Sequence, residues 1–186
     1  MYRLFFIILF FCLAGVVNAQ YKHSLADTIP LVTITGKQIK FYPVKKLQVV
    51  IFLSIDCPLS QKYTRTLNEL SKTFASNVSF YGVFPDTTSS MNDYSQFQKK
   101  YEIPFELILD KNRKLTKALK AQITPECFMI SEGKILYHGA IDDWVVGLGK
   151  TKAQPKIQYL QNAITDVLSG RNAGLDYKKP IGCYID

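Results

Sequence analysis

The residue with the clearest chemical potential is Cys57, which follows an apolar run and directly precedes a proline. Residues 49–53 are apolar, and a short polar turn then leads into Cys57 and Pro58. Proline is favoured at the first position of a helix, so Cys57 is expected to be the cap residue. The unpaired N–H groups and the positive dipole end of a helix N-terminus favour a thiolate, which is the reactive form of cysteine. The pattern predicts a nucleophilic thiol at a strand-to-helix junction.

A second thiol is needed if Cys57 exchanges disulfides, because exchange passes through a mixed disulfide that must be resolved. Cys183 can do this if the tail folds back and brings the two Cα atoms within about 4.4–6.8 Å. A free tail cysteine, or one linked to another chain, is the alternative. Cys127 lies in an expected strand, where a small apolar core residue is the simpler interpretation.

Residues 1–19 have the pattern of a secretory signal peptide. Arg3 precedes an apolar run over residues 4–17, and Val17-Asn18-Ala19 resembles a cleavage site. A membrane anchor is the alternative, but the run is shorter than the roughly 20 residues that a span needs. We therefore expect an exported, periplasmic or extracellular protein with no stable membrane span after cleavage. An odd count of three cysteines would remain, which predicts one pair plus a free thiol, or a reactive thiol.

Composition limits the other classes of function. The 186 residues are 47% hydrophobic and carry a net charge of +8, which falls to +7 without the signal peptide. This length predicts one domain with appendages: an entry segment over 20–30, a domain over 31–170 and a C-terminal tail over 171–186. The lysines are scattered, and no basic run is interleaved with stacking aromatics, so no nucleic-acid partner is expected.

Periodicity predicts an α/β domain. Leu59, Tyr63, Leu67, Leu70 and Phe74 recur at helical spacing after Cys57. Strand, helix and strand over 49–84 form a βαβ unit. The expected elements are a hairpin over 32–41, strands over 49–54, 78–84 and 105–109, helices over 57–75, 91–101 and 115–119, a second hairpin over 123–138, a loop over 139–154 and a last helix from Pro155 to about 168.

This order resembles the thioredoxin fold over residues 31–168, in the redoxin and peroxiredoxin-like branch that includes the alkyl hydroperoxide reductase and thiol-specific antioxidant families. Residues 52–58 match the active-site turn, Thr124-Pro125 falls where the fold has its cis-proline, and residues 128–135 match the next strand–turn–strand. The resemblance implies a central mixed β-sheet flanked by helices, with an N-terminal β-hairpin and a C-terminal tail. It also implies that Pro125 abuts Cys57, and that Pro58, Thr124 and Pro125 contact substrate.

The chain departs from the family pattern in three places. Ser60 stands where thioredoxins have a second cysteine, so no local disulfide can form. Leu53 and Ser54 stand where peroxiredoxins have proline and threonine, and Pro125 lies where they place an arginine near the turn. The copper-carrying branch uses two cysteines and a distant histidine, and this chain lacks that pair. We therefore expect no metal and no cofactor.

Several neighbouring side chains have competing interpretations. Asp56 would raise the pKa of the Cys57 thiol, whereas Lys62 would lower it. Ser54 and Ser60 can donate hydrogen bonds to a thiolate, although turn and cap roles are simpler. Further along, Trp144 is expected to anchor a loop whose acids, Asp142 and Asp143, are solvated, with a substrate groove as the alternative. His23 and His138 are expected on the surface or in strands rather than as bases.

Together these features predict an exported thiol-disulfide oxidoreductase, with Cys57 as the nucleophile and Cys183 as the resolving residue. Its partners would be protein or small-molecule disulfides and an external thiol reductant. One alternative is a peroxiredoxin-like thiol peroxidase, in which Cys57 becomes a sulfenic acid that condenses with Cys183. The other is a non-catalytic module that binds extended peptides at Pro125. Either redox reaction requires that solvent can reach the sulfur of Cys57.

Overall fold

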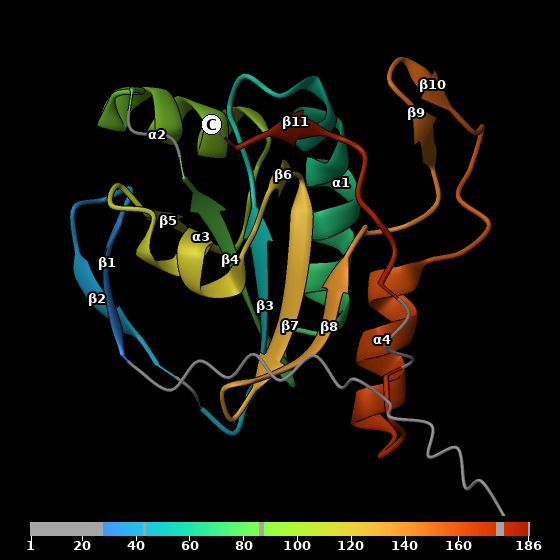
Figure 1. Cartoon of the computed structure of the whole chain (residues 1–186). Helices are drawn as coiled ribbons and strands as arrows, with labels where there is room; N and C mark the ends of the chain where they lie inside the picture. The colour runs from blue at the N-terminus through green and yellow to red at the C-terminus, as the bar shows by residue number, and fades with distance from the viewer. Residues whose placement is uncertain (1–27, 43, 86–87, 174–176, 186) are drawn as a thin grey trace, which may run out of the picture.

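The computed structural model describes residues 28–42, 44–85, 88–173 and 177–185. The expected signal peptide and most of the entry segment lie outside the described residues. The described chain forms a seven-stranded mixed sheet with the strand order β2-β1-β5-β4-β3-β7-β8. Helices cover both of its faces (Figure 1). The α/β architecture and the N-terminal hairpin agree with the sequence prediction.

The strands of the main sheet are β1 (Ile29–Thr33), β2 (Gln38–Phe41), β3 (Leu47–Phe52), β4 (Val78–Phe84), β5 (Glu106–Leu109), β7 (Glu126–Ser131) and β8 (Lys134–Gly139). The helices are α1 (Pro58–Thr73), α2 (Met91–Lys100), α3 (Lys114–Leu119) and α4 (Tyr159–Leu168). Four short strands lie outside the main sheet: β6 (Ile123–Thr124), β9 (Val145–Gly147), β10 (Lys150–Thr151) and β11 (Cys183–Tyr184).

Strand β3 is the centre of the sheet, and every one of its residues is buried. It runs parallel to β4 and antiparallel to β7. The register with β7 pairs Phe52 with Glu126, so the end of β3 lies beside the start of β7. Continuous apolar sequence suits such a strand because the sheet is covered on both faces. The predicted βαβ unit is confirmed.

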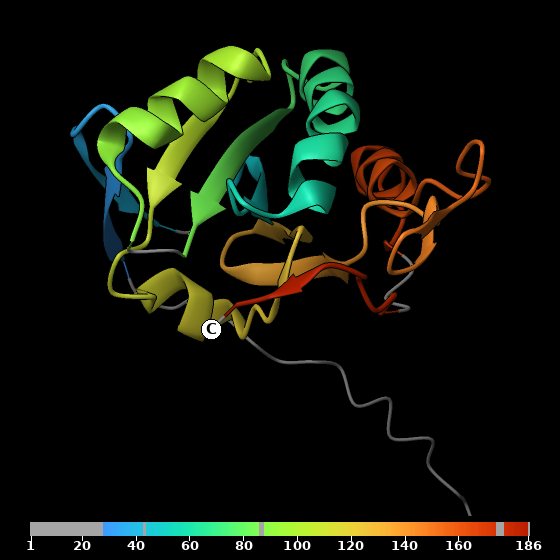
Figure 2. The ribbon, with the colours of Figure 1, turned by 90° about the horizontal axis from the view of Figure 1, so that it is seen from above.

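The two faces of the sheet have separate cores. Helices α1, α2 and α4 contribute to one apolar cluster, and α3 contributes to the other (Figure 2). Helix α1 has Cys57 as its N-cap residue and Pro58 in its first turn, as the sequence predicted. Its Leu67 is fully buried in the larger cluster. The helix is held by this apolar face, which fixes the position of its first turn.

Two elements differ from the sequence prediction. The expected loop over 139–154 contains the β9–β10 hairpin, whose turn includes Gly149 at a φ of +71°. The last helix begins at Tyr159 rather than at Pro155. The N–H groups of Lys156 and Ile157 donate to a carboxylate oxygen of Asp143 at 2.7 and 3.0 Å, which holds this segment in a turn before the helix. These contacts, rather than the proline, determine where the helix begins.

Two strand limits also differ. Strand β1 begins at Ile29, inside the expected entry segment, where Ile29 pairs with Phe41 and is buried. The expected strand over 123–130 is divided into β6 and β7 at Pro125, whose bond to Thr124 is cis. Proline lacks the N–H that a continuous ladder would need, which accounts for the break.

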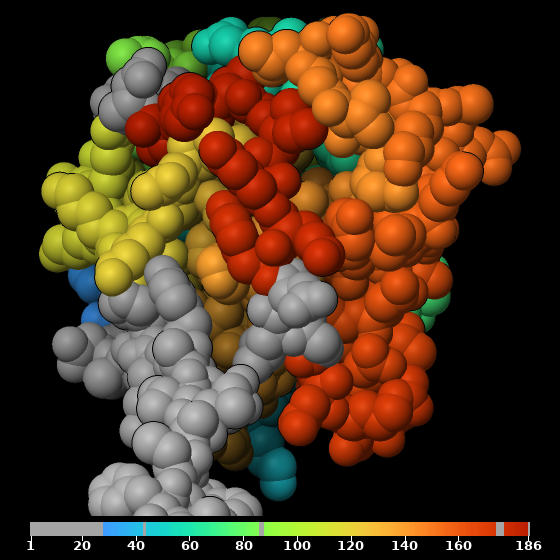
Figure 3. All heavy atoms as spheres, turned by 45° about the vertical axis from the view of Figure 1, so that its right-hand side comes forward, coloured from blue at the N-terminus to red at the C-terminus, as the bar shows by residue number. Residues whose placement is uncertain are grey.

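The C-terminal segment 177–185, called the strap below, is packed against the domain. It runs across the surface between the segment before β6 and the segment that carries β9 and β10 (Figure 3, red). Its strand β11 pairs antiparallel with β6. None of the described helices is long and apolar enough to cross a membrane.

The α1 face generates a stability prediction. Replacing Leu67 by Ala removes a fully buried side chain and should lower the free energy of unfolding by about 3 kcal/mol. Leu148→Ala is the matched control, because Leu148 is 78% exposed in the β9–β10 turn and should cost almost nothing. Urea denaturation of both variants checks this, and equal midpoints would contradict the packing of α1.

Candidate active site

Cys57 is held where the polar turn after β3 becomes helix α1. Its N–H donates to the carbonyl of Ser54 at 3.3 Å, and its own carbonyl accepts from the N–H of Gln61 at 3.0 Å. The backbone N–H groups of Leu59 and Ser60, in the first turn, both donate to the sulfur, as does the hydroxyl of Ser60. Ser60 therefore supplies hydrogen bonds to the thiolate, as well as accepting one from the N–H of Ser54.

The cis peptide bond between Thr124 and Pro125 lies directly beside this thiol. The Cys57 thiol donates to the carbonyl of Thr124 with a separation of 3.2 Å. The buried carboxylate of Glu126 accepts from the N–H groups of Gln122 and Ile123, and so holds the chain just before the proline. Burial raises the pKa of Glu126, although those two N–H groups oppose the shift. Sequence reasoning had missed this positioning role, for which no local motif exists.

Cys183 lies on the strap, next to Cys57. It lies opposite Thr124 in the β11–β6 pair, and the Thr124 hydroxyl donates to its carbonyl at 3.4 Å. The Cys183 thiol donates a hydrogen bond to the Cys57 sulfur, and both cysteines are free thiols. The structure thus brings together Cys57, Thr124, Pro125 and Cys183, and it leaves Pro58 exposed beside them.

The pKa of the Cys57 thiol lies below its ordinary value of 9.0. Burial raises this pKa, but hydrogen bonds from Cys183, from the N–H groups of Ser60 and Leu59 and from the Ser60 hydroxyl outweigh burial. The bond from Cys57 to Thr124 exists only while the thiol is protonated. Hydrogen bonds therefore stabilise the thiolate, whereas Asp56 and Lys62, the two charges considered from sequence, are both exposed.

The pKa of Cys183 shifts in the opposite direction, to about 12. Burial is the largest cause, followed by its hydrogen bond to Cys57 and the repulsion between the two sulfurs. The first proton lost from this pair therefore leaves Cys57. The arrangement favours ionisation of Cys57 first and keeps Cys183 protonated as a donor while Cys57 carries the charge.

The expectation that the sulfur of Cys57 is open to solvent is wrong for this conformation. Cys57 is only 1% exposed. Thr124 of β6 and Cys183 of the strap lie against its sulfur, so the folding back of the tail that would let Cys183 act as the resolving thiol also covers Cys57. The C-terminal segment that contributes Cys183 lies on the surface of the domain (Figure 3), so part of the cover is the strap and part is the domain's own Thr124.

Cys127 is a core residue, as the simpler interpretation held. It is fully buried and its thiol donates to the carbonyl of Gly139 at 3.2 Å. Burial is the largest cause that raises its pKa well above the ordinary value, and the nearby Glu126 carboxylate adds to it. A thiol that is both unreachable and un-ionised is chemically inert.

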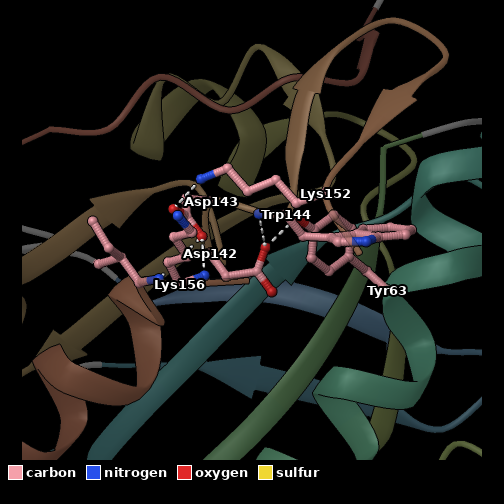
Figure 4. Close-up of polar contacts among 7 residues, drawn as sticks. Tyr63, Asp142, Asp143, Trp144, Lys152 and Lys156 are labelled. Carbon is pink, nitrogen blue, oxygen red and sulfur yellow. Dashed lines mark hydrogen bonds and ion pairs between the residues drawn. The ribbon is translucent and has the colours of Figure 1, made fainter. Parts of the chain in front are cut away.

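A groove of about 390 Å³ continues from Pro125 along the strap. Its lining includes Asp142, which is buried rather than solvated as expected. The Asp142 carboxylate accepts hydrogen bonds from the Tyr63 hydroxyl at 2.6 Å and from the backbone N–H of Trp144 at 2.9 Å (Figure 4). The rings of Tyr63 and Trp144 meet edge to face, with centroids 5.5 Å apart. Burial raises the pKa of Asp142, which these hydrogen bonds oppose. Trp144 packs against the larger apolar cluster, which confirms its predicted anchoring, and the groove is lined by Asp142 and Asp143.

The wall of the groove is held by Asp143. Its carboxylate pairs with Lys152 and accepts from the backbone before α4 (Figure 4). The hydrogen bond from Lys152 is the main reason why the pKa of Asp143 falls to about 2. Among the described residues, no cluster of three or more histidine, cysteine or acidic side chains is arranged to hold a metal ion.

Comparison with known proteins identifies the family. The profile of the AhpC/TSA family matches residues 24–138, which is more than half of the chain. The chain belongs to the AhpC/TSA family. No curated protein matches the sequence significantly.

Solved structures agree on the fold. A hypothetical protein from Sinorhizobium meliloti 1021 is 23% identical with a TM-score of 0.75, covering 86% of this chain and 91% of that one. An uncharacterised conserved protein from Geobacillus kaustophilus is 21% identical with a TM-score of 0.77, covering 87% and 89%. A secreted Mycobacterium tuberculosis disulfide oxidoreductase is 19% identical with a TM-score of 0.53, covering 79% and 96%. The AhpC/TSA chain therefore has a thioredoxin-like fold of the type found in thiol-disulfide oxidoreductases.

The hydrogen bonds around Cys57 generate a prediction about its ionisation. Replacing Cys183 by Ala removes the strongest hydrogen bond to the thiolate, so the pKa of Cys57 should rise. Ultraviolet absorbance of the thiolate, followed against pH, checks this because Cys127 and Cys183 stay protonated where Cys57 titrates. Cys127→Ala is the control and should leave the midpoint in place. A wild-type midpoint at or above 9.0 would contradict the assignment.

Proposed function

We propose that this AhpC/TSA-family chain is a thiol-disulfide oxidoreductase in which Cys57 attacks a disulfide and Cys183 resolves the product. The observation that carries the proposal is the hydrogen bond from the Cys183 thiol to the Cys57 sulfur, at a helix N-terminus and beside a cis-proline. A nucleophile with a lowered pKa and a second thiol in contact with it are the two groups that exchange needs.

The reaction balances with these two sulfurs. The Cys57 thiolate attacks one sulfur of a substrate disulfide, a mixed disulfide forms, and the other substrate sulfur leaves as a thiolate that takes up a proton. Cys183 then loses its proton and attacks the sulfur of Cys57, which releases the second substrate thiol. The substrate gains two electrons and the protein keeps a Cys57–Cys183 disulfide, which an external thiol reductant returns to two thiols.

The order of the two attacks follows from the pKa directions. While Cys57 is a thiolate, its negative charge and its hydrogen bond hold the proton on Cys183. Once Cys57 is in a mixed disulfide, that charge is gone and only burial still opposes ionisation of Cys183. The resolving thiol is therefore activated by the step that creates its target.

Export supports protein disulfides as the substrate class. The signal-like pattern of residues 1–19 directs the chain to compartments where disulfides persist. The secreted disulfide oxidoreductase with a similar fold is consistent with such a location. Pro58, Thr124 and Pro125 surround the thiol and would form the contact surface for the substrate.

Membership of the AhpC/TSA family favours a second candidate, a thiol peroxidase. The Cys57 thiolate would attack a peroxide oxygen, forming a sulfenic acid and releasing an alcohol or water, and Cys183 would condense with it and release water. Position 125 holds proline where peroxiredoxins place an arginine, which makes this reaction the second candidate. A third candidate, a peptide-binding module, requires that Cys57 be chemically inert.

Treatment with glutathione disulfide, followed by mass mapping of thiols, tests the exchange. The wild-type chain should lose both free thiols to a Cys57–Cys183 disulfide, whereas Cys183→Ser should accumulate glutathione on Cys57, because nothing resolves it. Cys57→Ser should be inert, and Cys127→Ala should behave as wild type because Cys127 is buried. A Cys183 that remains a free thiol in the wild type would contradict its role as the resolving residue. Peroxide consumption by the wild type, well above that of free cysteine, would favour the peroxidase.

A further inference from the structure

The strap is attached to the domain at points distributed along its length. The ring of Tyr177 stacks on that of His138 with centroids 4.7 Å apart. The carbonyl of Lys178 accepts from the N–H of Ala140 at 2.8 Å, and the N–H of Ile185 donates to the carbonyl of Gln122 at 2.9 Å. Pro180 is buried between these points. The strap therefore occupies a defined position beside Cys57. This position, called the seat, is formed by His138, Ala140, Gln122 and strand β6.

Two glycines allow the strap to lie this close to the backbone of the domain. A Cβ atom on Gly182 would lie 2.1 Å from the carbonyl oxygen of Thr124. A Cβ atom on Gly139 would lie 2.4 Å from the carbonyl oxygen of Lys178. Atoms that are not bonded cannot approach so closely, so one glycine on the strap and one on the domain are required by the seat.

The seat includes the edge of strand β6, which the strap covers. Strand β6 pairs only with β11 among the described strands, and Cys183 lies opposite Thr124 in that pair. Strand β11 has two residues, and its Tyr184 is 72% exposed. The two-residue pairing of β11 with β6 is short, so breaking it costs few ladder hydrogen bonds, and the strap's other contacts are single points on either side of it.

We propose that the strap is a displaceable occupant of the β6 edge, and that its exchange partner is an extended polypeptide with glycine directly before its cysteine. The strap shows what the edge accepts: a strand that places a sulfur against Cys57 and has no side chain at the preceding position. Any partner cysteine that reaches Cys57 in this register meets the carbonyl of Thr124 in the same way, so it too needs glycine there.

The strap and the partner exclude each other, and this couples resolution to release. Cys57 is 1% exposed, so a polypeptide disulfide reaches it only when the strap has left. After the mixed disulfide forms, Cys183 returns to Cys57 only as the strap re-pairs with β6, which removes the partner strand from the same edge. In the same register, the partner's residues before the Gly-Cys pair would replace strap residues 177–181, which line one wall of the groove along Asp142 and Pro125.

This proposal rests on the proposed function for its redox meaning, but its test needs no redox step. In a Cys183→Ser background, Gly182→Val should displace the strap and raise the rate at which N-ethylmaleimide alkylates Cys57 by about ten-fold or more, in proportion to the opened population. Mass mapping reads out Cys57 alone. Gly147→Ala is the matched control, since a Cβ there meets only the Lys150 side chain at ordinary contact distance, and the rate should not change. Equal alkylation rates in the Cys183→Ser chain and in its Gly182→Val and Gly147→Ala variants would show that the strap does not cover Cys57.

A second variant separates displacement of the strap from misfolding of the domain. Tyr177→Ala, in the same background, removes the stacking on His138 and leaves the Thr124 contact in place, so it should raise the rate in the same direction by a smaller factor. Circular dichroism of each variant establishes that the domain is folded. An unchanged rate in a folded Tyr177→Ala chain, together with an unchanged rate for Gly182→Val, would show that the strap does not control access.

The sequence preference is tested with a peptide of residues 178–185 that has Ser in place of the cysteine. It should bind the Gly182→Val, Cys183→Ser chain and return Cys57 alkylation toward the slower rate. The same peptide with Val in place of its glycine should do neither. Equal protection by both peptides would overturn the glycine requirement. Failure of the glutathione experiment with success here would leave a strand-binding site without the exchange reaction.

Discussion

The site depends on one hydrogen bond, from the thiol of Cys183 to the sulfur of Cys57. Burial alone would favour the protonated form of both thiols, since it raises both pKa values. The donated hydrogen bond separates them, because it stabilises the thiolate of Cys57 and retains the proton of Cys183. The helix N-terminus adds N–H donors on the side of Cys57 only, so the direction of the separation is set by the backbone.

The backbone around this pair is held in position by contacts that lie outside the pair. Strand β3 is buried along its whole length and ends beside the start of β7, which fixes where the turn to α1 begins. Glu126 accepts two N–H groups just before the cis-proline and so holds β6 in place. Strand β6 in turn carries the carbonyl of Thr124 that contacts Cys57 and the edge that carries Cys183. A buried acid with no chemical step of its own thus positions both sulfurs.

The part of this site that depends on local sequence could be predicted. A continuous apolar run, a cap cysteine and a proline at the first helical position are signals within a few residues, and they placed Cys57 correctly. The burial of Cys57 and the short pairing of β11 could not be predicted, because both depend on contacts between residues far apart in the chain, 67 positions for Cys57 and Thr124 and 59 for Thr124 and Cys183. Asp142 was expected to be solvated because it lies in a polar loop, yet a tyrosine from α1 makes its burial tolerable.

The same short strap has two opposing effects on Cys57. It lowers the pKa of the thiol through Cys183, and it covers the sulfur that this makes reactive. When the strap leaves, Cys57 gains access but loses its strongest hydrogen-bond donor, while the reduced burial and the N–H groups of Leu59 and Ser60 still favour the thiolate. The covered state therefore protects a thiol whose pKa is lowered, and the open state keeps the backbone part of the donor set. A strand that arrives on β6 restores the cover with its own sulfur in place of Cys183, which is why the identity of the residue before that sulfur matters to the chemistry.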